Sequence, residues 1–193
     1  MNTISNSLFD KIEREADLQY DELVCKLEQQ APVLENRLGK SLTEHMKILR
    51  DRYDNSSINP ARHVVISYLR TGLLDRHPLY LIAMYDQTYL FSENEYTVMW
   101  DIPDISNMPY EIADRSIKNF QDQIKVEVQA YYWEKILFLY AERFNDWFMK
   151  HMPDIIGCHL ADRGWKEFYT ENAIRISAGE YRNHIKRVFE WRK

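Results

Sequence analysis

The stretch from Tyr110 to Lys150 restricts the fold more than any other part of the chain, because it contains neither proline nor glycine. Its second half is crowded with large apolar side chains, and a helix that is apolar nearly all round belongs inside a protein or a membrane. Charged residues such as Glu134 and Arg143 interrupt it, whereas a membrane span needs roughly 18 or more mostly uncharged residues. We therefore predict a central core helix over residues 110–150.

The two halves of this predicted helix place their apolar residues on opposite sides. At about 100° per residue, Ile117 and Phe120 fall on one side and Ile136 and Tyr140 on the other. Either the helix breaks near Gln129, or its halves pack against different partners. We favour one long helix that serves two cores.

Length and composition indicate one folded domain over residues 1–193. Hydrophobic residues make up 45% and charged residues 28%, which is the range of folded globular proteins. The segment Met1–Ser5 lacks the pattern of a signal peptide, and no segment is uncharged for long enough to span a bilayer. Two distant cysteines, Cys25 and Cys158, do not resemble a secreted disulfide framework. We expect a soluble, cytoplasmic protein.

Aromatic residues are abundant, at 13% of the chain with 13 Tyr and 5 Trp. Tyrosine and tryptophan suit half-buried surfaces, so the excess favours broad packed interfaces within the chain or with a partner. Biased composition of the source genome is the alternative. The net charge of −5 is spread along the chain, which argues against a nucleic-acid partner.

The first half of the chain combines helices with a small sheet. Residues 1–55 carry an apolar stripe at helical spacing that Pro32 interrupts, so we predict an antiparallel helical pair or a single kinked helix. Over residues 59–101 we predict a helix plus a β-meander. Asn59 and Pro60 form a helix start, giving a helix over 60–75. Three short apolar runs follow, at 79–85, 88–91 and 96–100.

The second half of the chain is mostly helical after the 110–150 helix. Pro153 opens the C-terminal helices of residues 153–193, and the alternating segment 173–177 is a possible edge strand. The predicted fold is α+β and mostly helical. A long central helix and flanking helices pack on a small three- to four-stranded antiparallel sheet.

Metal-ligating residue types cluster once, in His151, Cys158, His159 and Asp162. Their spacing matches no structural zinc pattern, so we predict no metal and no cofactor. The carboxylates of the predicted central helix, such as Glu127, Glu134 and Glu142, lack the Glu-x-x-His motif of a di-iron bundle.

Motifs of catalysis are missing from the sequence. It contains no Gly-x-Ser-x-Gly turn, and its five glycines form no phosphate-binding loop. No group of residues resembles the motif of a known family. We therefore lean against an enzyme.

Polar and aromatic residues near the predicted strand ends suggest one ligand site. We expect them to converge where the 60–75 helix meets the β-meander, in a cleft with aromatic walls and an Arg or Asp that orients a ligand. They are His63, Arg70, Tyr85, Asp86, Trp100 and Asp101.

Our first functional hypothesis is a non-catalytic interaction or regulatory domain that acts through aromatic-rich surfaces. Its partner would be another protein or a second copy of the chain, and neither a nucleic acid nor a membrane. The alternative is a small-molecule-binding sensor or enzyme that uses the cleft just described.

Overall fold

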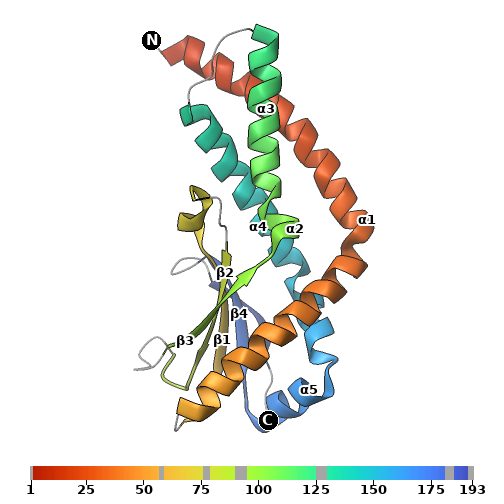
Figure 1. Cartoon of the computed structure of the whole chain (residues 1–193), viewed down its shortest axis with the longest axis vertical. Coiled ribbons are helices and arrows are strands. Elements are labelled where there is room, and N and C mark those ends of the chain that lie inside the picture. Colours follow the sequence, from red (N-terminus) through yellow and green to blue (C-terminus); the bar gives the residue numbers. More distant parts are fainter. Residues whose placement is uncertain are drawn as a thin grey trace.

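The computed structural model describes residues 2–56, 59–75, 79–89, 95–124, 130–180 and 185–190. The molecule is elongated, with a helical part at one end and a sheet covered by helices at the other (Figure 1). The α+β, mostly helical fold was predicted correctly. The sheet, however, has five strands and is mixed, whereas three or four antiparallel strands were predicted.

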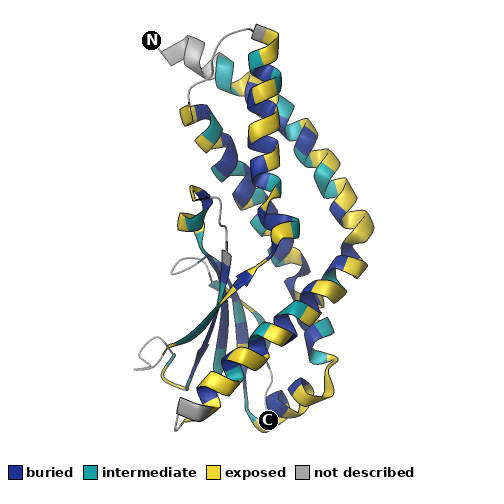
Figure 2. Ribbon diagram, in the orientation of Figure 1, coloured by how far each residue is buried: buried dark blue, intermediate teal, exposed yellow. Residues whose placement is uncertain are grey.

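The N-terminal segment is one helix, α1 (Asn2–Ser56), so the predicted antiparallel pair is wrong and the single kinked helix is right. Pro32 lies inside α1, and the helix bends near its middle (Figure 1). Proline lacks an N–H group and its ring crowds the carbonyl four residues earlier, which accounts for such a bend. One face of α1 is buried along its length and the opposite face is exposed (Figure 2). This is the predicted apolar stripe, from Ile12 to Tyr53.

The predicted 60–75 helix is wrong, because this segment begins with a strand. β1 (His63–Tyr68) is followed by a 3-10 turn, η1 (Arg70–Leu73). The β-branched run Val64, Val65 and Ile66 is buried on both faces, as in a central strand. The Asn59–Pro60 pair thus precedes a strand rather than capping a helix.

The sheet has the order β3-β2-β1-β4-β5. The meander strands β2 (Leu79–Tyr85) and β3 (Tyr96–Asp101) were predicted correctly. The predicted 88–91 strand is wrong in its described part, because Thr88 and Tyr89 belong to a turn after Asp86, and residues 90 and 91 lie outside the described residues. The strand predicted at 173–177 exists as β4 (Arg175–Glu180). It is not an edge strand, because it pairs in parallel with β1 and antiparallel with β5 (Ile185–Glu190). β5 replaces the helix predicted there.

The single 110–150 helix is wrong. Two helices take its place after the short α2 (Pro103–Ser106). They are α3 (Met108–Ile124) and α4 (Ala130–Leu160), and α4 runs back beside α3 (Figure 1). Each helix buries its own apolar face against the other and against α1, which explains the opposed faces of the two halves. Pro153 does not start a helix, since α4 continues through it while its buried neighbours Ile155 and Ile156 hold the last turns.

Helix α4 runs alongside α1 in the same direction. Residue numbers rise together in the side-chain contacts between the two helices, which defines a parallel pair. The contacts are Asp17 with Tyr140, Glu28 with Trp147, Glu35 with His151 and Thr43 with His159.

Most of the aromatic surplus is internal. The largest fully buried side chains include Trp100, Tyr140 and Trp165, and α5 (Arg163–Glu171) adds Phe168 and Tyr169 to the same core. Among the described residues, Tyr131 is the aromatic side chain found with the large exposed apolar ones. The aromatic-rich interaction surface therefore stays a prediction.

No helix in the described ranges combines the length and the apolarity that crossing a bilayer requires.

Candidate functional site

The six residues of the predicted ligand site lie in three places. His63 and Tyr85 face each other in the β1–β2 register, and Asp86 follows directly. Arg70 lies beyond the opposite end of β1, which at about 3.3 Å per residue is roughly 20 Å away. The structure therefore does not bring all six into one cleft.

The group at the first end of the sheet is stabilised by local contacts. The His63 ring lies 4.9 Å from the Tyr89 ring. The Asp86 carboxylate accepts hydrogen bonds from Thr88 and from Asn59. Burial, with Arg175 nearby, lowers the pKa of His63, and the bonds from Thr88 lower the pKa of Asp86. These contacts stabilise the end of the sheet where β2 leaves it, so the group has a structural role there.

Trp100 and Asp101 end the edge strand β3 and do not share an environment. Trp100 is fully buried, its indole N–H donates to Ser41 Oγ at 3.0 Å, and its ring packs on Phe148. Asp101 is exposed. Trp100 is thus a core residue that joins the sheet to α1 and α4.

Arg70 is the predicted residue that does line a cleft. Two adjoining hollows, of about 420 and 480 Å³, share Tyr68, Arg70 and Glu180 in their walls. They lie where the parallel strands β1 and β4 end, next to α4. Such strand ends are a common place for ligands in α/β sheets. We call the two hollows together the Arg70 cleft.

The two sides of the Arg70 cleft differ in polarity. The first hollow adds charged and amide side chains, and the second adds apolar ones. The first is further lined by Glu142, Asn145, Asp146 and Lys186, and the second by Leu69, Leu74 and Phe138. Burial raises the pKa of Tyr68, so its hydroxyl stays protonated at neutral pH and can donate a hydrogen bond.

The four residues of the predicted metal group are in separate environments. His159 is fully buried, with Nδ1 2.8 Å from Thr43 Oγ1 and Nε2 3.1 Å from the Tyr169 hydroxyl. Asp162 caps α5, where its carboxylate accepts from the N–H groups of Gly164 and Trp165. His151 lies eight residues before His159 on α4, or about 12 Å along the axis. This set does not form a metal site.

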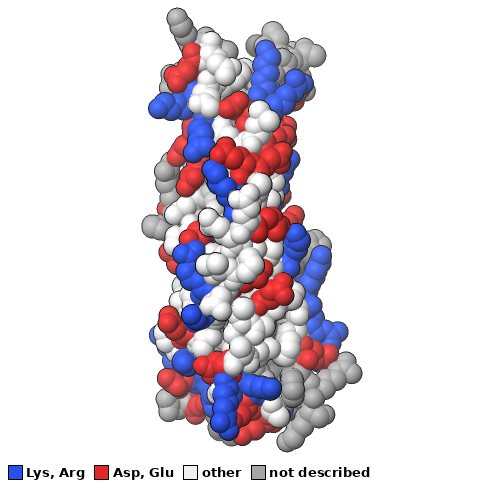
Figure 3. Space-filling view, turned by 90° about the vertical axis from the view of Figure 1, so that its right-hand side faces the viewer, with Lys and Arg blue, Asp and Glu red and all other residues white. Residues whose placement is uncertain are grey.

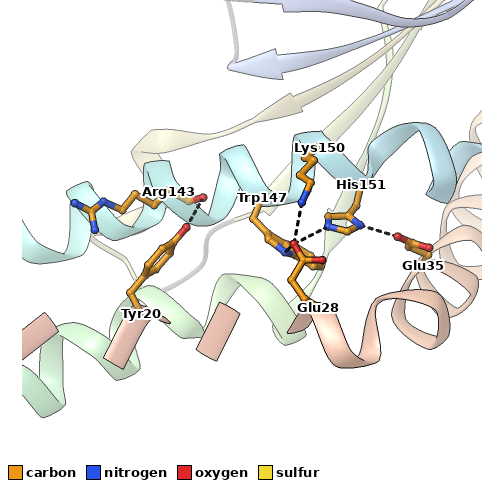
Figure 4. A network of polar contacts seen from close by, with 7 residues as sticks. All are labelled: Tyr20, Glu28, Glu35, Arg143, Trp147, Lys150 and His151. Atoms are coloured by element: carbon orange, nitrogen blue, oxygen red, sulfur yellow. Dashed lines mark hydrogen bonds and ion pairs between the residues drawn. The ribbon is translucent and has the colours of Figure 1, made fainter. Parts of the chain in front are cut away.

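His151 instead belongs to a cluster between α1 and α4. Its Nδ1 lies 2.6 Å from Glu35 Oε1, and its Nε2 lies 3.5 Å from Glu28 Oε1 (Figure 4). The Glu28 carboxylate also accepts from Trp147 Nε1 and from Lys150 Nζ. Asp154 completes the group, with one donor atom each from Asp154, His151 and Glu35 within 4.8 Å of one another. We call Glu28, Glu35, His151 and Asp154 the α1–α4 cluster.

Cys158, the remaining member of the predicted metal group, lies further along α4 where the two helices touch. Burial raises the pKa of its thiol, and the carboxylates of Glu35 and Asp154 add to that effect. A raised pKa keeps the thiol protonated and unreactive at neutral pH. This agrees with the absence of a nucleophile motif around it in the sequence.

Sequence reasoning missed Glu28 and Glu35. A usable signal existed, because the two are seven residues apart on α1 and therefore share a face at the edge of its apolar stripe. What the spacing does not reveal is the partner helix.

No protein-family model, curated protein or solved structure matches this chain.

Proposed function

We propose that the chain binds a small amphipathic anion in the Arg70 cleft. The observation that most supports this proposal is the position of Arg70 at the junction of the two hollows. Its guanidinium would hold a carboxylate or phosphate group, while the apolar end of the ligand lies between Leu74 and Phe138. The combined size of the hollows suits such a ligand, since pockets for small molecules span about 300–1,000 Å³.

The ion pairs that hold Arg70 are exchangeable. Arg70 lies 2.9 Å from Glu142 and 3.8 Å from Glu180, and the Arg70 and Glu142 side chains are about half exposed, at 48% and 54%. Exposed ion pairs contribute only about 0–1 kcal/mol. An incoming anion can therefore replace the Glu142 carboxylate at little cost and form the paired N–H···O contacts that arginine favours.

The apolar hollow favours a ligand with a hydrocarbon or aromatic part. Leu74 lines this hollow together with Phe138 and is 54% exposed. The Arg70 guanidinium lies over the Phe138 ring, 5.3 Å from its centre. Covering this apolar surface would stabilise a complex by about 25 cal/mol for each Å² removed from water. The contact between a cation and an aromatic ring also holds the guanidinium in place for the ligand.

Two probes with the same tail and opposite head groups test the proposal. Octanoate should raise the melting temperature of the wild-type protein, and octylamine at the same concentration should not, because Arg70 selects the carboxylate. Replacing Arg70 with alanine should weaken octanoate binding at least about tenfold, the loss expected for a charge-assisted hydrogen bond. Thermal shift and calorimetry measure both effects.

Two variants separate this mechanism from general surface effects. Glu142→Gln should leave octanoate binding equal or tighter, because it removes the carboxylate that competes for Arg70. Arg163→Ala, which breaks the exposed Arg163–Glu167 pair on α5, should leave octanoate binding unchanged. Preference for octylamine, or unchanged octanoate binding by Arg70→Ala, would contradict the proposal.

A further inference from the structure

The α1–α4 cluster brings a histidine and carboxylates from two helices to one point, outside the Arg70 cleft. Donor atoms of Glu35, His151 and Asp154 lie within 4.8 Å of one another. A four-coordinate zinc ion with bonds of about 2.0–2.1 Å needs its ligand atoms about 3.3 Å apart. Rotation of the exposed Asp154 side chain can bring its carboxylate to that spacing, and Glu35 Oε1, now 2.6 Å from His151 Nδ1, must move back to about 3.3 Å.

His151 carries a polar atom that the surrounding protein leaves unsatisfied. The residue is only 8% exposed, and its Nε2 is buried without a hydrogen bond. A buried polar group without a partner is destabilising by about 1–3 kcal/mol. Nε2 is directed at Glu28, 3.5 Å away, while Nδ1 is already bonded to Glu35 (Figure 4). The ring is thus placed between carboxylates on both sides.

The charges of the cluster are unbalanced on the side of Nδ1. Lys150 lies 3.0 Å from Glu28 and neutralises it. Within the ranges that the structure describes, neither Glu35 nor Asp154 forms an ion pair with a lysine or arginine. On the face drawn in Figure 3, acidic and basic side chains are interspersed among uncharged ones, without a large region of one sign. A cation beside Glu35 and Asp154 would restore the balance.

We propose that Glu35, His151 and Asp154 bind a divalent transition-metal ion, with zinc as the best fit. His151 would coordinate through Nδ1, and its Nε2–H would then donate to Glu28. A metal-bound histidine usually donates its second N–H to a carboxylate, which fixes the ring and raises its basicity. This arrangement fixes the tautomer in which Nε2 carries the proton and Glu28, already 3.5 Å away, accepts it. Glu28 is a positioning residue here, held by Trp147 and Lys150.

The donor set also determines which ions bind. Imidazole nitrogen with carboxylate oxygen suits zinc, cobalt and manganese, whereas magnesium prefers oxygen ligands and retains its water. The exposure of Asp154 leaves room for a water molecule as a further ligand. The site is therefore of the open type rather than a closed structural one.

Calorimetry on chelator-treated protein tests the site directly. Zinc should bind with one ion per chain, and Co²⁺ should give the visible absorption of a low-coordinate site. Asp154→Asn is the decisive variant, because its exposed side chain can change without disturbing the core. It and Glu35→Gln should each weaken zinc binding at least about tenfold, and Glu28→Gln about tenfold through the orientation of His151.

Matched controls come from residues outside the cluster. Asp122→Asn removes an exposed carboxylate from α3, and His45→Gln removes a histidine from α1 outside the cluster. Both should bind zinc within about twofold of wild type. Failure to bind zinc at millimolar concentration, or tight binding retained by Asp154→Asn, would overturn the assignment. Circular dichroism of each variant confirms that it is folded.

Discussion

Replacing Gly39 with alanine is expected to lower the free energy of unfolding by about 2 kcal/mol, although glycine-to-alanine changes inside helices usually stabilise. A Cβ on Gly39 would lie 2.5 Å from Cys158 Cβ, 2.9 Å from the Ile155 carbonyl oxygen and 3.1 Å from the His159 nitrogen. Two of these atoms belong to the backbone of α4, so they cannot rotate away. Urea unfolding monitored by circular dichroism measures the change.

Gly157 supplies the control within the same helix pair. It lies on the exposed side of α4, and a Cβ there would meet no atom within 4 Å. Gly157→Ala should therefore raise the free energy of unfolding by up to about 1 kcal/mol, through helix propensity alone. The two identical substitutions are expected to have opposite signs. If Gly39→Ala also stabilises, α1 and α4 do not touch at this point.

The stability of the protein should fall by up to about 3 kcal/mol in mild acid because of His159 alone. Burial lowers the pKa of this imidazole to about 4, from 6.5 in an unfolded chain, and Lys47 adds to the effect. The Nδ1–H tautomer satisfies the site, because Thr43 donates to the Gly39 carbonyl and can accept from Nδ1, while Nε2 accepts from Tyr169. Protonation would remove that acceptor.

The direction of this pH effect follows from proton binding. Between pH 6.5 and about 4 the unfolded chain holds a proton on His159 and the folded chain does not. The contribution is therefore complete above the unfolded pKa and is lost as the pH falls toward the folded pKa. Glu and Asp residues also titrate in this range, so wild type must be compared with a variant.

His159→Gln provides that comparison. It should be about 2 kcal/mol less stable than wild type near neutral pH, because it disturbs a buried hydrogen-bond network. Near pH 4.5 the gap should close, because wild type has by then lost roughly 2.5 kcal/mol of the His159 contribution, as much as the gap itself. The difference in free energy of unfolding between His45→Gln and wild type should be the same near neutral pH and near pH 4.5. A gap that stays constant with pH would show that His159 does not stay neutral in the fold.

Local pattern sufficed where neighbours in sequence are also neighbours in space. The stripe of α1 and the short apolar runs of β2 and β3 are of this kind, and both were predicted correctly. β1 was not, because a short apolar run after Asn59 and Pro60 fits helix or strand equally. Its strand identity depends on pairing with β2 on one side and with β4, more than a hundred residues later, on the other.

The candidate sites show the same division. Arg70 and His151 were singled out from the sequence, and each lies in one of the two sites. Their partners were not found, because Glu142 and Glu180 reach Arg70 from α4 and β4, and Glu35 lies 116 residues from His151. The break between Ile124 and Ala130 was only the alternative to the favoured single helix, since no proline or glycine marks it.

The parallel pairing of α1 with α4 has a consequence for synthesis on the ribosome. The contacts that hold α1 against α4 join residues more than a hundred positions apart, so α1 emerges long before this partner exists. At about 5–20 residues per second, the interval between completing α1 and completing α4 is roughly 5–20 seconds. During that time the apolar face of α1 is exposed to solvent. Nascent chains should therefore be most vulnerable to aggregation and to chaperone capture before residue 160 has been added.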